Sequence, residues 1–163
     1  MKRILVTYYN YFSLIISAVI IGLDQLFKYL AVQYLYPVGT IPLWKGVFQL
    51  TYVENRGAAF GIFEGKKILL VGFTGVILLL LLLAVLFKKV THPVLVTSFA
   101  LIIGGGIGNL IDRTFLGYVV DYLHLTLFQF PVFNFADCAV VIGTILLIAY
   151  FFFWDKKENS EQR

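Results

Sequence analysis

Four long apolar stretches limit what this chain can fold into. They run approximately from Tyr11 to Leu30, from Ile68 to Phe87, from Val94 to Ile111 and from Ala136 to Trp154. A helix needs about 20 apolar residues to cross about 30 Å of hydrocarbon. With 60% hydrophobic and only 13% charged residues, the chain is also too apolar for a single water-soluble domain. The sequence therefore predicts an all-α membrane protein with four transmembrane helices.

The basic residues flank these stretches, so the net charge of +4 indicates membrane orientation rather than a nucleic-acid partner. Seven lysines and arginines lie in the termini and the middle loop, against five in or beside the other two loops. This asymmetry predicts that both termini are cytoplasmic. The first stretch contains Asp24 and Lys28 and lacks a small-residue cleavage site, so we expect it to remain in the mature protein.

Two residue types exclude other classes of site. The single cysteine, Cys138, excludes an internal disulfide and a multi-thiolate metal site. The two histidines, His92 and His124, are far apart in the chain, which argues against a metal centre. No metal or cofactor is expected.

Polar residues interrupt the apolar stretches or follow them closely, and in hydrocarbon such residues need partners. Because successive helices alternate in direction, these residues converge at one depth near the outer membrane surface. They are Asp24 and Lys28, then Asn109, Asp112 and Arg113, then Asp121, and finally Asn134 and Asp137.

Each of these groups also has a purely structural interpretation. Asp24 and Lys28 share a helix face at i and i+4, and a structural ion pair is favoured over direct chemistry. Asn109, Asp112 and Arg113 can form a hydrogen-bonded brace at a helix end.

The remaining polar residues and the glycines have similar alternatives. Asn134 and Asp137 can cap the fourth helix, and Asp121 taken alone is expected to be an exposed loop residue. The glycine run that includes Gly104 and Gly108 lacks the strand and the Lys-Ser/Thr ending of a phosphate loop. It therefore predicts close helix packing.

The first outer loop, residues 37–67, has its own organisation. Val47 to Val53 alternates and is rich in strand-forming residues, and residues 54–57 resemble a turn. A small sheet over the outer membrane surface is expected.

Two aspartates brought close together suggest hydrolysis without a covalent intermediate. Both cannot ionise together, so one can take a proton from water while the other donates to a carbonyl oxygen. No Gly-x-Ser-x-Gly stretch points to a serine nucleophile. Two other classes remain open: a small transporter, which usually shows inverted repeats, and a non-enzymatic assembly or lipid-binding subunit.

Five ordered motifs resemble those of the bacterial lipoprotein signal peptidases (signal peptidase II), and they cover nearly the whole chain. The motifs are Asp24-Gln25-x-x-Lys28, Asn55-x-Gly57-Ala58-Ala59-Phe60-Gly61, Gly105-Gly106-x-Gly108-Asn109-x-x-Asp112-Arg113, Gly117-x-Val119-Val120-Asp121 and Phe133-Asn134-x-Ala136-Asp137. The resemblance implies an aspartic endopeptidase of the bacterial inner membrane. Such an enzyme removes the signal peptide of prolipoproteins before the diacylglyceryl-modified lipobox cysteine.

The resemblance also implies a role for each candidate residue. Asp121 and Asp137 would form a catalytic dyad that acts on one water. Substrate-binding or bracing residues would be Asn55, Gly57, Asn109, Arg113 and Asn134, and a structural polar network would comprise Asp24, Lys28 and Asp112.

The organisation implied by the resemblance is a single peptidase domain over residues 1–154. Within it, loop 37–67 would form an extracytoplasmic β-cradle and loop 114–133 a lid, with residues 155–163 as a charged cytoplasmic tail. The expected partners are prolipoprotein substrates and membrane lipids, and inhibition by globomycin-type cyclic peptides is expected.

Overall fold

The computed structural model describes residues 2–57, 63, 65–88, 90–128 and 130–154. The predicted tail at 155–163 and the Ala58–Gly61 part of the second motif lie outside the described residues. The elements in chain order are α1 (Lys2–Leu30), the π-helix η1 (Ala31–Leu35), β1 (Thr40–Trp44), β2 (Phe48–Asn55), α2 (Lys67–Leu86), α3 (Pro93–Phe115), β3 (Val119–Leu125) and α4 (Phe135–Phe153).

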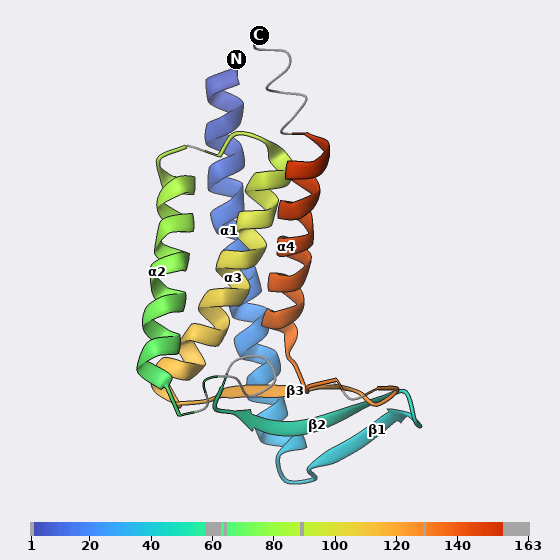
Figure 1. Cartoon of the computed structure of the whole chain (residues 1–163). Helices are drawn as coiled ribbons and strands as arrows, with labels where there is room; N and C mark the ends of the chain where they lie inside the picture. The colour runs from blue at the N-terminus through green and yellow to red at the C-terminus, as the bar shows by residue number, and fades with distance from the viewer. Residues whose placement is uncertain (1, 58–62, 64, 89, 129, 155–163) are drawn as a thin grey trace.

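The helices form an elongated bundle, and the sheet lies across one end of it (Figure 1). Within the described residues, four helices are long and apolar enough to cross a membrane, which confirms the four predicted spans. The first span, Tyr11–Leu35, extends beyond the predicted end at Leu30, because η1 continues α1 to Leu35. This extension carries the buried residues Ala31 and Leu35 under the sheet.

The glycines of α3 let its neighbours pack closely. A Cβ atom at Gly104 would lie 2.9 Å from Ile20 of α1, and one at Gly108 would collide with Asp24 of the same helix. The predicted packing role of these two glycines is confirmed. Gly105 faces α4 and Gly106 faces α2 in the same way, so α3 is the central helix of the bundle.

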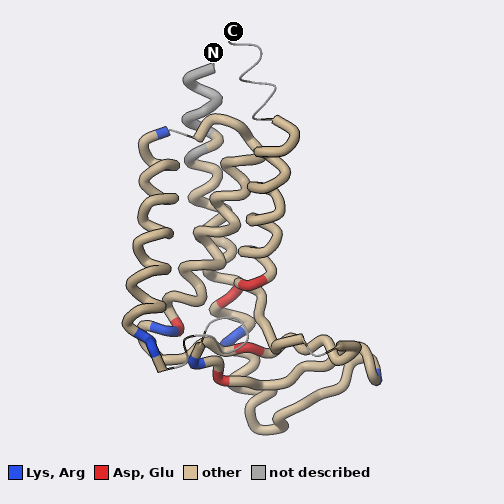
Figure 2. Tube along the Cα trace, viewed as in Figure 1, with Lys and Arg blue, Asp and Glu red and all other residues tan. Residues whose placement is uncertain are grey.

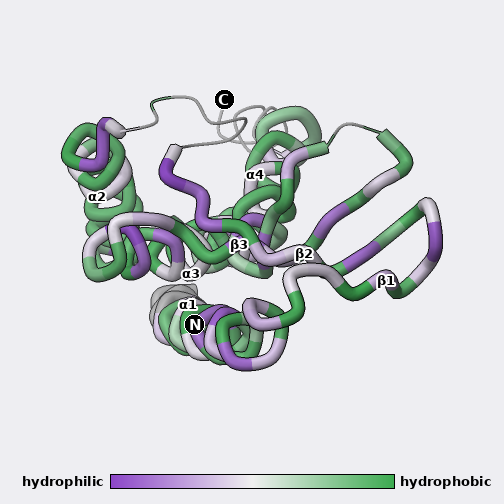
Figure 3. The backbone as a smooth tube through the Cα atoms, turned by 90° about the horizontal axis from the view of Figure 1, so that it is seen from below, coloured by the Kyte–Doolittle hydropathy of each residue, from purple (hydrophilic) through white to green (hydrophobic). Residues whose placement is uncertain are grey.

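Much of the outer surface of the helices is apolar. Large side chains such as Phe73 and Leu80 of α2 and Ile145 of α4 are exposed. Figure 3 shows mostly hydrophobic colour along the helices and more hydrophilic colour on the strands. A hydrocarbon environment accounts for this distribution.

The sheet is antiparallel, with strand order β1-β2-β3. The strand predicted at 47–53 is found as β2, and β3 lies inside the loop that was expected to form a lid. Pairing of β2 with β3 places Asn55 opposite Val119 and Val53 opposite Asp121. The sheet thus carries polar residues from two distant loops to the end of the bundle, where the described charged residues concentrate (Figure 2).

Candidate active site

The first turn of α4 fixes the position of Asp137. The side chain of Asn134, the N-cap residue, accepts a hydrogen bond from the Asp137 amide at 2.9 Å. The Asp137 carboxylate in turn accepts one from the Asn134 amide at 3.1 Å. This reciprocal capping box confirms the predicted cap. The other carboxylate oxygen of Asp137 accepts from Nδ2 of Asn109 on α3, at 2.7 Å.

Asp121 lies in the strand β3 and is only 1% exposed. The expectation that this residue, taken alone, is exposed is therefore wrong, because pairing with β2 and packing against the helix ends cover it. Its carboxylate accepts hydrogen bonds from Nδ2 of Asn55 at 2.9 Å and from Nδ2 of Asn134 at 2.7 Å.

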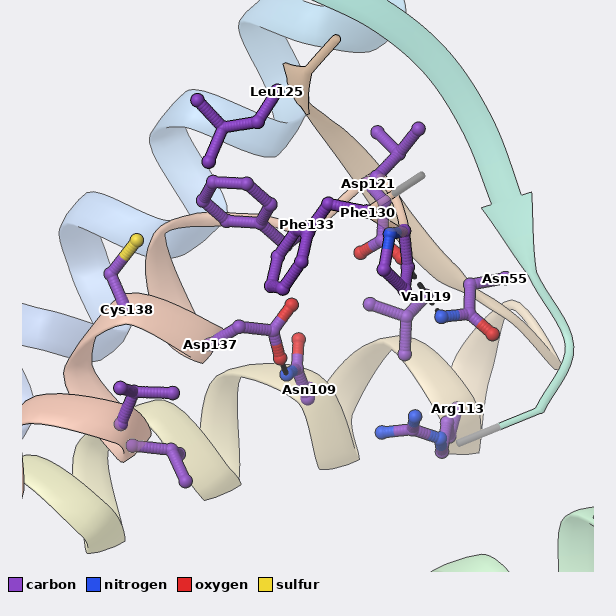
Figure 4. A pocket seen from close by; sticks show the side chains of 14 residues that line it. Asn55, Asn109, Arg113, Val119, Asp121, Leu125, Phe130, Phe133, Asp137 and Cys138 are labelled. Atoms are coloured by element: carbon purple, nitrogen blue, oxygen red, sulfur yellow. Dashed lines mark hydrogen bonds between the residues drawn. The ribbon is translucent and has the colours of Figure 1, made fainter. Parts of the chain in front are cut away.

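The two carboxylates therefore have matching surroundings. Each of their four oxygens accepts one hydrogen bond from a neutral amide group. Figure 4 shows Asp121 and Asp137 in the same pocket, with Asn55 and Asn109 beside them. A carboxylate oxygen has two lone pairs, so each one can still accept a hydrogen bond from a water or a substrate group.

Burial and the nearby negative charge of Asp137 together raise the pKa of Asp121 to about 7, although the hydrogen bonds from the amides of Asn55 and Asn134 oppose the shift. This carboxyl therefore holds its proton to a much higher pH than an ordinary aspartic acid does. A pair of carboxyls that holds one proton can supply both an acid and a base.

A second acidic cluster surrounds Lys28. The Lys28 ammonium is 2.8 Å from Oδ2 of Asp24 and 3.0 Å from Oδ2 of Asp112. All three residues are almost completely buried. The structure confirms the predicted ion pair between Asp24 and Lys28 and extends it to Asp112. Gln25 also belongs to this cluster, since its amide donates to Asp112 at 3.0 Å; sequence analysis gave it no role.

This ionic cluster also anchors the backbone beside each carboxylate of the pocket. Asp112 accepts a hydrogen bond from the amide of Val120, the residue before Asp121, at 3.1 Å. Asp24 accepts one from the amide of Ala136, the residue before Asp137, at 3.1 Å. The ionic cluster therefore connects β3 and α4 to α1 and α3.

Arg113 and Gly57 connect α3 to the chain after β2. Nη2 of Arg113 donates to the carbonyl oxygen of Gly57 at 2.9 Å. The Gly57 amide donates to Oδ1 of Asn55 at 3.0 Å, which leaves the Asn55 amino group facing Asp121. Gly57 thus contributes through its backbone, and Arg113 holds that backbone in place.

The pocket has a volume of about 400 Å³ and mostly apolar walls. Its polar lining comprises five of the predicted residues, and sequence analysis missed the apolar part. The lining residues are Asn55, Asn109, Arg113, Asp121 and Asp137, with Val119, Leu125, Phe130, Pro131, Val132, Phe133, Cys138, Val140 and Val141. In the part of the chain that the structure describes, no three His, Cys, Asp or Glu side chains are arranged to hold a metal ion.

Comparisons with known proteins show the family of the chain. The family model for signal peptidase (SPase) II matches residues 16–153. A lipoprotein signal peptidase of Halothermothrix orenii is 46% identical over 147 residues, which cover 90% of this chain and 98% of that protein. One from Caldanaerobacter subterraneus is 44% identical over 135 residues, which cover 83% and 92%.

A solved structure of a bacterial membrane enzyme gives a TM-score of 0.80 at 28% identity and covers 93% of this chain and 91% of its own. The overall fold is therefore shared over nearly the whole length of both chains. Together with the family match over residues 16–153, this likeness places the chain in the signal peptidase II family, whose members are peptidases.

Proposed function

We propose that this membrane peptidase removes the signal peptide of prolipoproteins by cutting before the diacylglyceryl-modified cysteine, with Asp121 and Asp137 acting on one water. The observation that carries the proposal is the pair of carboxylates in one pocket, held by amide donors on all four oxygens. The curated relatives are named lipoprotein signal peptidases, which supports the choice of substrate.

The chemistry begins with one proton shared by the two carboxyls. The ionised carboxylate removes a proton from the water, and the water oxygen attacks the scissile carbonyl carbon. The protonated carboxyl donates its proton to the carbonyl oxygen. The tetrahedral intermediate then collapses, and a proton passes to the leaving nitrogen of the cysteine. The products are a new carboxyl end on the signal peptide and a free amine on the lipidated cysteine. Because the two carboxyls titrate as a unit, either can be the base in the resting enzyme.

The position of the pocket suits a lipid-attached substrate. It lies at the sheet end of the bundle (Figure 1), and we place this end at the outer surface of the bacterial inner membrane, with both termini in the cytoplasm. A diacylglyceryl chain is held in the leaflet by its buried methylenes. The scissile bond can therefore reach the carboxylates without extraction of the lipid.

The apolar walls favour an apolar peptide segment. Phe130, Phe133 and Val141 line the pocket together with the carboxylates. We expect globomycin-type cyclic peptides to compete for this space.

The expected lid, residues 114–133, contains the strand Val119–Leu125, which belongs to the sheet. We therefore restrict the proposed lid to the segment between β3 and α4.

The test is cleavage of a diacylglyceryl-modified lipobox peptide by purified enzyme in detergent, with the products identified by mass spectrometry. Wild type should cut immediately before the modified cysteine, and Asp121→Asn and Asp137→Asn should each lose activity while remaining folded. Glu54→Gln is the matched control, because Glu54 is a carboxylate of the same sheet that pairs with Arg56 on the surface. Cleavage at another bond would overturn the proposed cleavage site. No cleavage by wild type, or near-full activity in either variant, would overturn the role of the two aspartates and favour a transport or assembly role.

A further inference from the structure

The Lys28 ammonium has three N–H groups and three acceptors. Two of the acceptors are the carboxylates of Asp24 and Asp112. The third is Oδ1 of Asn109, at 2.8 Å. Lys28 is only 3% exposed, so water does not readily replace any of these partners. One N–H group of a buried cation is thus directed at a single amide oxygen.

That contact decides which way the Asn109 amide points. An ammonium can only donate, so the oxygen of Asn109 must face Lys28 and the amino group must face the opposite side. On that side the amino group donates to Oδ1 of Asp137 at 2.7 Å. If the amide turned over, two donors would meet at Lys28 and two acceptors would meet at Asp137. Asn134 supports the same orientation by donating to Oδ1 of Asn109 at 3.0 Å.

We propose that Lys28 is a positioning residue of the peptidase, which acts through Asn109 by holding its amide in the orientation that donates to Asp137. This inference rests on the proposed function. It gives Lys28 a task beyond joining two helices, because the same ammonium also controls the hydrogen bonding of a carboxylate that it does not contact.

Several charged groups from different elements surround this connection. Asp24 on α1 and Asp112 on α3 contact Lys28 directly. Arg113 on α3, Asp121 on β3 and Asp137 on α4 line the neighbouring pocket. A useful variant must therefore remove the N–H donor of Lys28 and leave the net charge of the ionic cluster unchanged.

The double variant Lys28→Met/Asp24→Asn meets this requirement. Wild type has one cation and two carboxylates in the ionic cluster, and the double variant retains only Asp112, so both have a formal charge of −1 there. The asparagine oxygen can still accept from the amide of Ala136, as Asp24 does. The single variant Asp24→Asn is the reference that keeps Lys28.

The readout is the pH dependence of kcat and of kcat/KM for the lipobox peptide. Without the Asn109 donor, the carboxyl pair ionises less readily, so the acid limb of kcat/KM in the double variant should move up by about one pH unit. At pH 6 we expect kcat to fall roughly tenfold or more, with KM changed by less than about threefold. A loss of folded protein alone would lower activity at every pH without moving the limb.

A double-mutant cycle shows whether the effect passes through Asn109. In an Asn109→Ala background the Lys28 substitution should no longer move the acid limb, because the amide that it orients is absent. A shift of unchanged size in that background would mean that Lys28 acts through space, and it would overturn the inference.

Lys28→Gln/Asp24→Asn is a second variant in case the methionine variant does not fold. Its amide offers a donor and an acceptor, so it tolerates either orientation of Asn109, and a smaller upward shift of the same limb is expected. An acid limb that coincides with those of wild type and Asp24→Asn would reject the role of Lys28. If Asp121→Asn and Asp137→Asn are themselves active, the proposed function fails first, and the two failures remain distinguishable.

Discussion

The protein contains two pairs of aspartates that are held in different ways. Asp24 and Asp112 share the ammonium of Lys28, whereas Asp121 and Asp137 receive hydrogen bonds from amides. The Lys28 ammonium offsets one of the two negative charges of the first pair. The second pair has only neutral amides as its hydrogen-bond donors, and the burial of Asp121 and the nearby charge of Asp137 raise the affinity of the Asp121 carboxyl for a proton. The difference separates a group that stabilises the fold from one suited to acid–base chemistry.

The largest expected effect tests whether Asp121 and Asp137 act as one unit. Each single Asp→Asn variant should lower kcat/KM by about 10³-fold or more, which is in the range found for acid–base groups. The double variant should lose little more than either single variant, because residues that act as a unit are not additive. Initial rates of peptide cleavage measure this, with thermal melting to show that each variant is folded. Additive losses would mean that the two carboxylates have separate tasks.

The ionic cluster should respond in stability rather than in chemistry. Asp112→Ala leaves one carboxylate with the Lys28 ammonium and removes the acceptor of the Val120 amide. A buried polar group left without its partner costs about 1–3 kcal/mol, so detergent-solubilised protein should melt at a clearly lower temperature. Glu54→Ala, which removes the surface ion pair with Arg56, is the control and should change stability by about 1 kcal/mol or less. Equal effects from the two variants would contradict the structural role of the cluster.

The raised pKa of Asp121 predicts how stability depends on pH. Its value rises from 3.8 to about 7 because of burial, so between these values the folded protein binds more protons at this site than the unfolded chain does. Stability from this group is therefore greatest at acid pH and declines as the pH rises through about 7. Asp121→Asn removes this titration. Its melting temperature should improve relative to wild type between about pH 4 and about pH 8, by the equivalent of a few kcal/mol at most. A gap that is constant with pH would contradict the shift.

The smallest expected effect concerns the contact between α3 and α4. A Cβ atom at Gly105 would collide with the carbonyl oxygen of Ala136, directly before Asp137. Gly105→Ala should therefore displace the start of α4, at a cost of about 1–3 kcal/mol in stability, and it should lower kcat because the carboxylates lose their alignment. Gly75→Ala on α2 is the matched control, since its Cβ would have no neighbour within 4 Å. Cleavage rates and melting curves of both variants distinguish the two sites, and equal rates would show that this contact does not align Asp137.

Several features could be predicted from the sequence because their causes are local. The spans follow from runs of apolar residues, and all four are found. The capping box depends on Asn134 and Asp137, three residues apart, and the ion pair on Asp24 and Lys28, four apart. Each of these interactions lies within a single helix, so helical spacing alone predicts it.

Other features depend on contacts between distant segments. A sheet was expected within residues 37–67, but the position of β1 and the strand β3 were not predicted. Strand pairing in a sheet joins residues far apart in the chain, here Val53 with Asp121. Burial of Asp121 follows from that pairing, which is why the residue looked exposed in isolation. The third partner of Lys28 and the orientation of Asn109 also require α1, α3 and α4 to be in place.

The sequence by itself determined that the chain spans a membrane and which polar residues interrupt its helices, because hydrocarbon imposes length and composition on each helix separately. The tertiary structure decided which carboxylates are paired with a cation and which are bound by amides. Apart from the local pair of Asp24 and Lys28, that distinction depends on side chains from different elements meeting at distances near 3 Å, which no local pattern specifies. The proposed division between structural and catalytic aspartates therefore depends on the folded arrangement.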